Sequence, residues 1–145
     1  MKNLLCLVLI LLSPNVLSQY WMNSNSLKSN SACIPIKLVT NNNSTNFALG
    51  AFVGDITFKN INFSSNGGVD YYLVSYNENS EYNWLQTFGS SMSEYANGSA
   101  NIAGDSLYII GSYQGICEFP GGNSVESDGN NDVFLARYRF NGTID

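Results

Sequence analysis

Two aspartates, Asp70 and Asp132, are the residues whose type and spacing could do chemistry. They lie 62 residues apart in similar surroundings. Paired carboxyl groups serve as general acid and general base when a fold brings them together. Because each aspartate precedes one of two similar segments, we expect a structural role for both. Each carboxylate should accept hydrogen bonds from nearby backbone amides in a turn.

Histidine is absent from the sequence. This removes the commonest general base, the usual partner of a nucleophilic serine or cysteine, and the commonest zinc ligand. Serines are plentiful, but no Gly-x-Ser-x-Gly elbow occurs. The Gly121-Gly122 pair does not precede a predicted helix, so a phosphate cradle is unsupported. We predict that the protein is not an enzyme, and we assign no catalytic or cofactor-binding residues.

The stretch from Asp128 to Asp132 is rich in side-chain oxygens and contains a glycine, like a calcium loop. It lacks the closing bidentate glutamate that such loops use. The equivalent stretch from Asn66 to Asp70 also has fewer oxygen ligands. We therefore predict no metal site.

Cys33 and Cys117 follow the N-terminal segment. In an oxidising compartment they could form a disulfide, but the sequence does not give the distance between them. A disulfide and two buried thiols both remain open at this point. No further cysteine or histidine is present to complete a metal site with them.

The N-terminus has the pattern of a secretory signal peptide. Lys2 precedes an apolar run from Leu4 to Leu12, and small residues follow. The run is shorter than the ~20 residues that span a bilayer. We predict a signal peptide over residues 1–18, removed before Gln19, and a secreted or cell-surface protein; a retained N-terminal anchor is the alternative. No later segment of the sequence is apolar enough to cross a membrane.

The remaining composition points away from nucleic acid and leaves glycans open. The net charge is −5 and the six basic residues form no cluster, so a phosphate backbone is not a predicted partner. We expect the recurrent tyrosines and tryptophans to pack in the core, whereas exposed Tyr95 or Tyr113 would favour sugar binding. Asn-x-Ser/Thr sequons, which chance also supplies in an Asn-rich chain, occur at Asn42, Asn43, Asn62, Asn97 and Asn141.

The sequence repeats itself with a period of about 62 residues. Gly50 to Gly54 matches Gly111 to Gly115 at an offset of 61. The matches from Asp70 to Asn79 recur between Asp132 and Asn141 at an offset of 62, and Trp21 and Trp84 lie 63 apart.

Each copy reads as short strands joined by turns and loops, without a helical period. In the last predicted strand, alternate apolar residues share one face and two arginines occupy the other. Asn141-Gly142 predicts a type I′ hairpin turn. The predicted strands are 71–77, 84–88, 99–103, 107–113 and 133–140, with turns at 41–44 and 104–105 and a long loop over 115–131.

Repeated units of four antiparallel strands are typical of β-propeller blades. We predict an all-β fold with about two blade-like repeats, residues 19–82 and 83–145, which do not close a ring. A β-sandwich is the alternative.

The second copy resembles the bacterial β-propeller repeat known as the SBBP repeat. The resemblance rests on five features: Trp84, Phe88-Gly89, Asn101 to Gly104, Tyr108 to Gly111, and the closing segment Asn130 to Gly142. It implies an exported or surface-associated protein and no common enzymatic activity. Most members carry many copies in a row.

Two copies depart from that pattern, because a closed propeller needs at least four blades. We therefore expect a fragment of a longer repeat protein, or a unit that covers its open sheet edges by self-association. The predicted function is a non-catalytic binding or scaffold module whose protein or glycan ligand is unidentified. A lectin-like propeller, or part of a propeller hydrolase or lyase, is the alternative.

Overall fold

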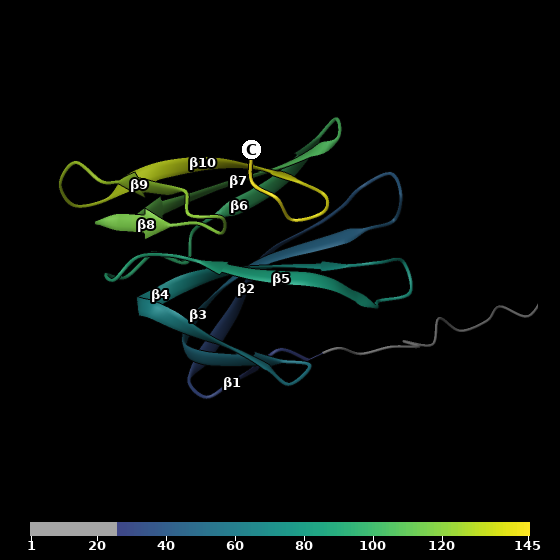
Figure 1. Ribbon diagram of the computed structural model, residues 1–145, viewed down its shortest axis with the longest axis horizontal. Helices are drawn as coiled ribbons and strands as arrows, with labels where there is room; N and C mark the ends of the chain where they lie inside the picture. The colour runs from purple at the N-terminus through teal and green to yellow at the C-terminus, as the bar shows by residue number, and fades with distance from the viewer. Residues whose placement is uncertain (1–25) are drawn as a thin grey trace, which may run out of the picture.

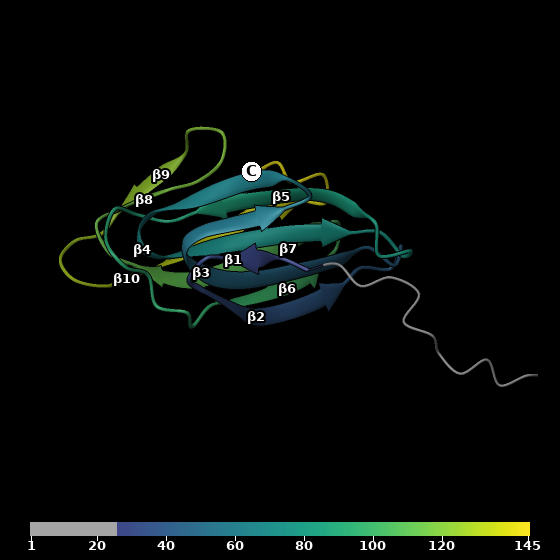
Figure 2. The same ribbon diagram turned by 90° about the horizontal axis from the view of Figure 1, so that it is seen from below.

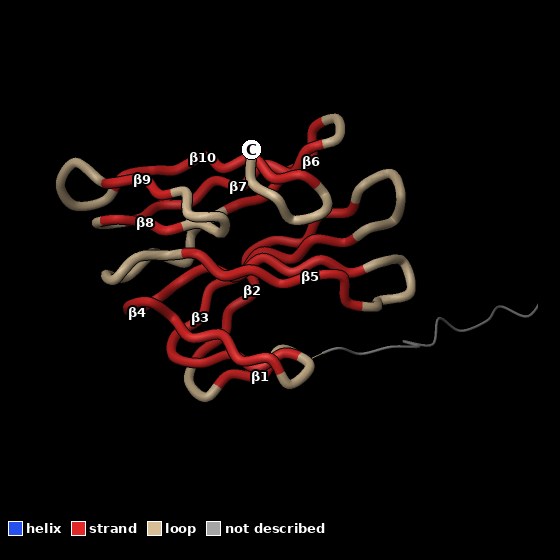
Figure 3. The backbone as a smooth tube through the Cα atoms, in the orientation of Figure 1, coloured by secondary structure: helices blue, strands red, loops and turns tan. Residues whose placement is uncertain are grey.

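The computed structural model describes residues 26–145; the predicted signal peptide and Trp21 lie outside this range. Within the described range the protein consists of antiparallel β-strands, turns and loops, without a helix (Figure 3). The all-β prediction is confirmed. The strands form two sheets that lie one above the other, with a short hairpin at one end (Figure 1).

The first sheet contains five strands. In it, β2, β3, β4 and β5 pair consecutively, and the two-residue β1 pairs with the far end of β3 (Figure 2). This sheet crosses the predicted boundary between residues 82 and 83, because β5, predicted as the first strand of the second repeat, pairs with β4. The strand bounds are β1 Lys28–Ser29, β2 Ala32–Thr40, β3 Asn46–Phe58, β4 Ile61–Tyr76 and β5 Tyr82–Phe88.

The second sheet has the order β10-β7-β6, and the strands β8 and β9 form a separate hairpin. The strands predicted at 99–103, 107–113 and 133–140 are confirmed to within one residue at each end. The long loop predicted over 115–131 is wrong in part, because it contains the β8–β9 hairpin. The bounds are β6 Ser99–Ala103, β7 Ser106–Tyr113, β8 Ile116–Glu118, β9 Ser124–Glu126 and β10 Asp132–Arg139.

Two glycines 61 residues apart have the same backbone conformation and similar hydrogen bonds. Gly54 and Gly115 both have φ of 73°, a left-handed conformation that glycine adopts without strain. The Gly54 amide donates to Ser65 Oγ at 3.1 Å, and the Gly115 amide donates to Ser127 Oγ at 2.7 Å. Gly54 lies at the register shift inside β3, whereas Gly115 lies between β7 and β8.

The turn after β10 differs from the prediction. Only Gly142 of the Asn141-Gly142 pair has positive φ, at 91°. The Gly142 amide donates to the Arg139 carbonyl at 2.9 Å, and the Arg139 amide donates to the Thr143 carbonyl at 2.8 Å. The type I′ assignment is therefore wrong, because the loop has three residues and needs left-handed backbone only at its last position.

Most of the core lies between the two sheets. Alternate residues of β10 point into it, and the two arginines of that strand point outward, as predicted. Aromatic rings meet across the interface; for example, Tyr71 and Phe134 lie edge to face at 5.7 Å between centroids. The buried residues of this interface core are Phe47, Leu49, Tyr71, Leu73, Phe88, Ala100, Leu107, Ile109, Tyr113, Cys117, Phe119, Phe134, Ala136 and Tyr138.

A second core covers the other face of the first sheet. The far end of the β3–β4 hairpin bends back over that face after a register shift between Val53 and Asp55. It carries two side chains, Ile56 and Phe58, into contact with the sheet. The members of this hairpin core are Phe52, Ile56, Phe58, Tyr72, Val74 and Leu85.

Candidate functional site

Asp70 and Asp132 make the same local hydrogen bond. The Asn66 amide donates to Asp70 Oδ2 at 2.6 Å, and the Asp128 amide donates to Asp132 Oδ2 at 2.7 Å. The turn-capping role predicted for the two carboxylates is confirmed. Asp70 lies within β4 of the first sheet and Asp132 begins β10 of the second, so the structure does not bring them together as a catalytic pair.

Asp70 instead lies beside a second carboxyl group, that of Glu94. The two residues are only 1 % and 2 % exposed. Asp70 Oδ1 and both Glu94 carboxyl oxygens are buried without a donor from any other described group. Burial, with the neighbouring Glu94, raises the pKa of Asp70 from 3.8 to about 7. A proton on Asp70 supplies the donor that the pair lacks.

The position of Glu94 is fixed by the loop between β5 and β6. The Glu94 amide donates to the Val69 carbonyl at 2.8 Å, and the Tyr71 hydroxyl donates to the Tyr95 carbonyl at 2.5 Å. Burial raises the pKa of Tyr71 to about 12, so its hydroxyl stays protonated. Sequence reasoning missed Glu94, because it lies in a loop without a repeat partner or a motif. Only its contact with Asp70 identifies it.

The carboxyl pair is closed to solvent. A side chain added at Gly89 would overlap the Asp70 carboxyl group, so the backbone covers this side of the pair closely. A substrate cannot reach either group in this arrangement. Among residues 26–145 no set of three or more histidine, cysteine or acidic side chains gathers as metal ligands. The pair is therefore suited to hold a proton and to join the loop to β4.

Cys33 and Cys117 are both free thiols in the described range. Cys117 is buried in the interface core, whereas half-buried Cys33 packs against the hairpin core on the other face of the first sheet. Burial, together with the nearby Glu94 and Asp70 carboxyl groups, raises the pKa of Cys117 to about 12. Of the two alternatives, the structure favours separate thiols over a disulfide.

The residues considered for glycans have different exposures. Tyr95 is 57 % exposed, but Tyr113 is only 5 % exposed and its hydroxyl donates to the Glu126 carbonyl at 3.1 Å. Tyr113 therefore belongs to the core and cannot stack on a sugar. The five asparagines of the Asn-x-Ser/Thr sequons are all exposed: Asn42, Asn43, Asn62, Asn97 and Asn141.

The two sheets use different faces of equivalent strands. In the first sheet, Tyr71 and Leu73 are fully buried against the second sheet. Their equivalents 62 residues later, Val133 and Leu135, are 67 % and 70 % exposed on the far side of β10. Ile110 adds to the same surface and is 44 % exposed. We call Ile110, Val133 and Leu135 the outer face.

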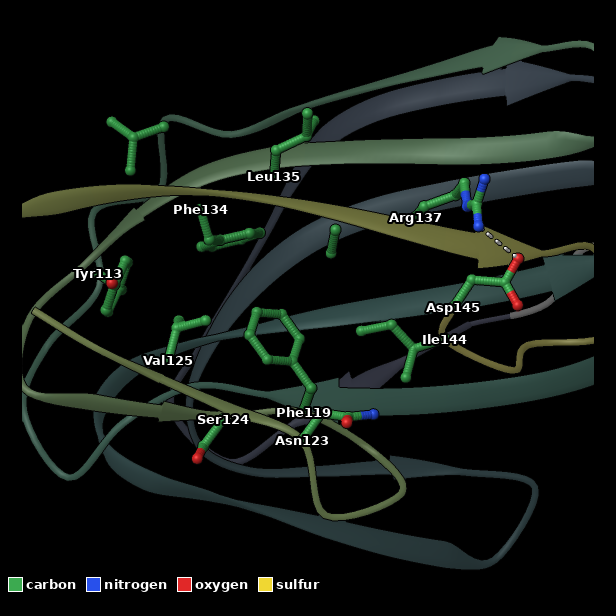
Figure 4. Close-up of a pocket in the computed structure, with 12 residues that line it drawn as sticks. Tyr113, Phe119, Asn123, Ser124, Val125, Phe134, Leu135, Arg137, Ile144 and Asp145 are labelled. Atoms are coloured by element: carbon green, nitrogen blue, oxygen red, sulfur yellow. Dashed lines mark ion pairs between the residues drawn. The ribbon is translucent and has the colours of Figure 1, made fainter.

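A groove of about 350 Å³ runs along the free edge of β10 (Figure 4). It lies between β10, the β8–β9 hairpin and the C-terminal residues, and the ion pair between Arg137 and Asp145 (3.2 Å) marks one end. We call it the edge groove. Its lining residues are Tyr113, Phe119, Asn123, Ser124, Val125, Val133, Phe134, Leu135, Ala136, Arg137, Ile144 and Asp145.

Comparisons of the chain with protein-family models, with characterised proteins and with solved structures find no match. Within residues 26–145, the structure contains no helix with the length and apolar character needed to span a bilayer.

Proposed function

We propose that the protein is a secreted or cell-surface repeat module that acts by packing against further β-units, as a non-catalytic scaffold. The exposed outer face carries the proposal. Leu135 is 70 % exposed, although its equivalent Leu73 is 0 % exposed against the neighbouring sheet. Isolated exposed apolar residues are ordinary, but an apolar set on one sheet face often marks an interaction site.

The packing between the sheets supports propeller-type blades over a two-sheet sandwich. The first sheet presents the Leu73 side of its meander, whereas the second presents the opposite side, with Phe134 and Tyr138. A contact between two different faces of equivalent units is heterologous, and it leaves one face of each type free for another unit. The outer face is the free surface that this relationship predicts. The resemblance to the SBBP repeat agrees with this interpretation.

The proposed absence of catalysis rests on the chemistry of the described residues. Their one close carboxyl pair, Asp70 and Glu94, is buried. Secretion rests on the sequence of residues 1–18 alone. Hydrolysis of a glycan or peptide by the purified chain would favour the propeller hydrolase or lyase instead.

A chain extended by one more copy of residues 83–145 tests the packing role. If the outer face accepts a like unit, the added copy should fold on it and bury Leu135. A Leu135→Cys thiol should then react with iodoacetamide at least ~10-fold more slowly in the extended chain than in the parent chain. The urea m-value should also rise, since m scales with the surface exposed on unfolding. Equal thiol reactivity and an unchanged m-value would refute the proposal.

A further inference from the structure

The edge groove corresponds to a place that is filled in the first sheet. There, β5 pairs along the free edge of β4, with Leu85 opposite Val74. Leu85 is 6 % exposed and belongs to the hairpin core. Its neighbours in that core include Phe52, Phe58, Tyr72 and Val74. The residues at equivalent positions in the second repeat are Tyr113, Phe119, Phe134 and Ala136, and all four line the edge groove.

Some backbone amides of β10 point toward the edge that borders the groove, and their direction follows from the hydrogen bonds at the end of the strand. Toward its end, the Arg139 amide donates to the Thr143 carbonyl, and the Asp145 amide donates to the Arg137 carbonyl. An isolated bridge pairs Tyr138 with Ile144. Since backbone groups alternate in direction along a strand, the amides of Val133 and Leu135 also face this edge. The even-numbered residues of β10 direct their backbone groups toward β7.

A segment of the same chain has the sequence of the strand that would fit. At an offset of 63, Trp21-Met22-Asn23-Ser24 matches Trp84-Leu85-Gln86-Thr87 residue type by residue type. The segment from Gln19 to Asn25 precedes the described structure and has the same length as β5, seven residues.

We propose that the edge groove binds residues 21–25 of a second copy of the chain as an antiparallel strand, with Met22 opposite Ala136 and its side chain in the groove; the positions before Trp21 are already taken by the chain's own Ile144 and Asp145. The register follows from the Val74–Leu85 pair of the first sheet. A second copy is required, because β1, which follows this segment, lies on the opposite side of the molecule from β10 (Figure 1). Strand addition of this kind gains main-chain hydrogen bonds along an open edge, and a side-chain pocket sets its register. Val133 and Leu135 border both surfaces, but strand addition uses the backbone edge of β10, whereas packing on the outer face uses side chains only.

Sedimentation of the chain beginning at Gln19, over a range of concentrations, tests the inference. The wild-type chain should associate. Met22→Asp should raise the dissociation constant at least about tenfold, since a charge would enter an apolar pocket. Its matched control is Asn23→Asp, which adds the same charge to a side chain directed away from the groove. This control should change the constant less than about twofold.

A second pair of variants tests the strand edge itself. Leu135→Pro removes one edge amide without removing a bond to β7, and proline is tolerated on edge strands at such positions. It should weaken association at least about tenfold, like Met22→Asp. Leu135→Ala keeps the amide and should weaken association less than Leu135→Pro does. Ile110→Ala, on the outer face but not among the lining residues of the groove, should leave association nearly unchanged. If Leu135→Pro does not fold, Met22→Asp alone tests the inference, because residue 22 precedes the sheets that the structure describes.

Three results would overturn the inference. The first is a wild-type chain that stays monomeric at millimolar concentration, and the second is association that persists in both Met22→Asp and Leu135→Pro. The third is association that Ile110→Ala abolishes, which would assign it to the outer face.

Discussion

Replacement of Asp70 by asparagine should separate the two roles of this side chain. The side-chain carbonyl that the substitution introduces can still accept the hydrogen bond that the Asn66 amide donates at 2.6 Å in the wild type. The new side-chain amide group can donate to the Glu94 carboxyl group at any pH. Asp70→Asn therefore keeps the turn and supplies permanently the donor that the wild-type pair has only when it holds a proton.

The sign of the effect follows from the pKa of Asp70. This pKa is raised from 3.8 to about 7 by burial, so the folded protein holds a proton that the unfolded chain releases. The stabilisation is fully present below pH ~4 and is lost as the pH rises through about 7. Each unit between the two values corresponds to about 1.4 kcal/mol, so the loss is about 4 kcal/mol at most. That is a large part of the ~5–15 kcal/mol by which small domains are stable.

Urea denaturation of both proteins at pH 4, 6 and 8 measures this loss. The free energy of unfolding of Asp70→Asn, minus that of the wild type, should rise from near zero at pH 4 to several kcal/mol at pH 8. Taking the difference removes the contribution of other carboxyl groups. Asp132→Asn is the matched control, because Asp132 makes the same backbone bond at 2.7 Å but starts a different strand. Its difference should not grow with pH.

A pH-independent difference in the free energy of unfolding between Asp70→Asn and the wild type would refute the claim that Asp70 holds a proton in the folded protein. So would a difference that falls toward pH 8, since it would mean that the folded protein prefers the ionised Asp70. The other titratable groups near the pair do not interfere in this range, because the pKa of Cys117 and the pKa of Tyr71 are both raised to about 12.

Five further substitutions, in three comparisons, test the packing described above by chemical denaturation. Leu73→Ala should cost about 2–5 kcal/mol of stability, because Leu73 is buried. Leu135→Ala should change stability by less than about 0.5 kcal/mol, because Leu135 is exposed. Similar losses of stability in the two variants would contradict the assignment of faces. Tyr71→Phe should cost about 1–3 kcal/mol, since its hydroxyl satisfies a backbone carbonyl in the loop that carries Glu94; a neutral result would remove that bond from the account. Gly54 and Gly104 both have positive φ, but Gly54→Ala should destabilise the protein more than Gly104→Ala. An added Cβ at Gly54 would lie 2.7 Å from a neighbouring oxygen, whereas at Gly104 it would meet nothing within 4 Å. Equal losses of stability would show that backbone strain alone decides.

Repeats and alternation in the sequence were sufficient to place β5, β6, β7, β10 and the last part of β4. The strand predicted over 99–103 matches β6, and the alternating residues around Phe134 predicted which side of β10 is buried. Both are local features, because an antiparallel strand places alternate side chains on opposite faces. The prediction failed where the pattern is weak, as in the β8–β9 hairpin, whose strands have three residues each and lie in a loop rich in turn formers.

The sequence by itself determined that Asp70 and Asp132 cap equivalent turns, because each aspartate bonds to an amide four residues before it. Only the tertiary structure decided that Asp70 is buried beside Glu94, which raises its pKa to about 7, and that Leu73 is buried while Leu135 is exposed. These properties depend on which face of each sheet meets the other and on how one loop crosses between them. A local repeat cannot encode that difference, since the two copies have similar sequences but only one contacts a sheet on its Leu73 side.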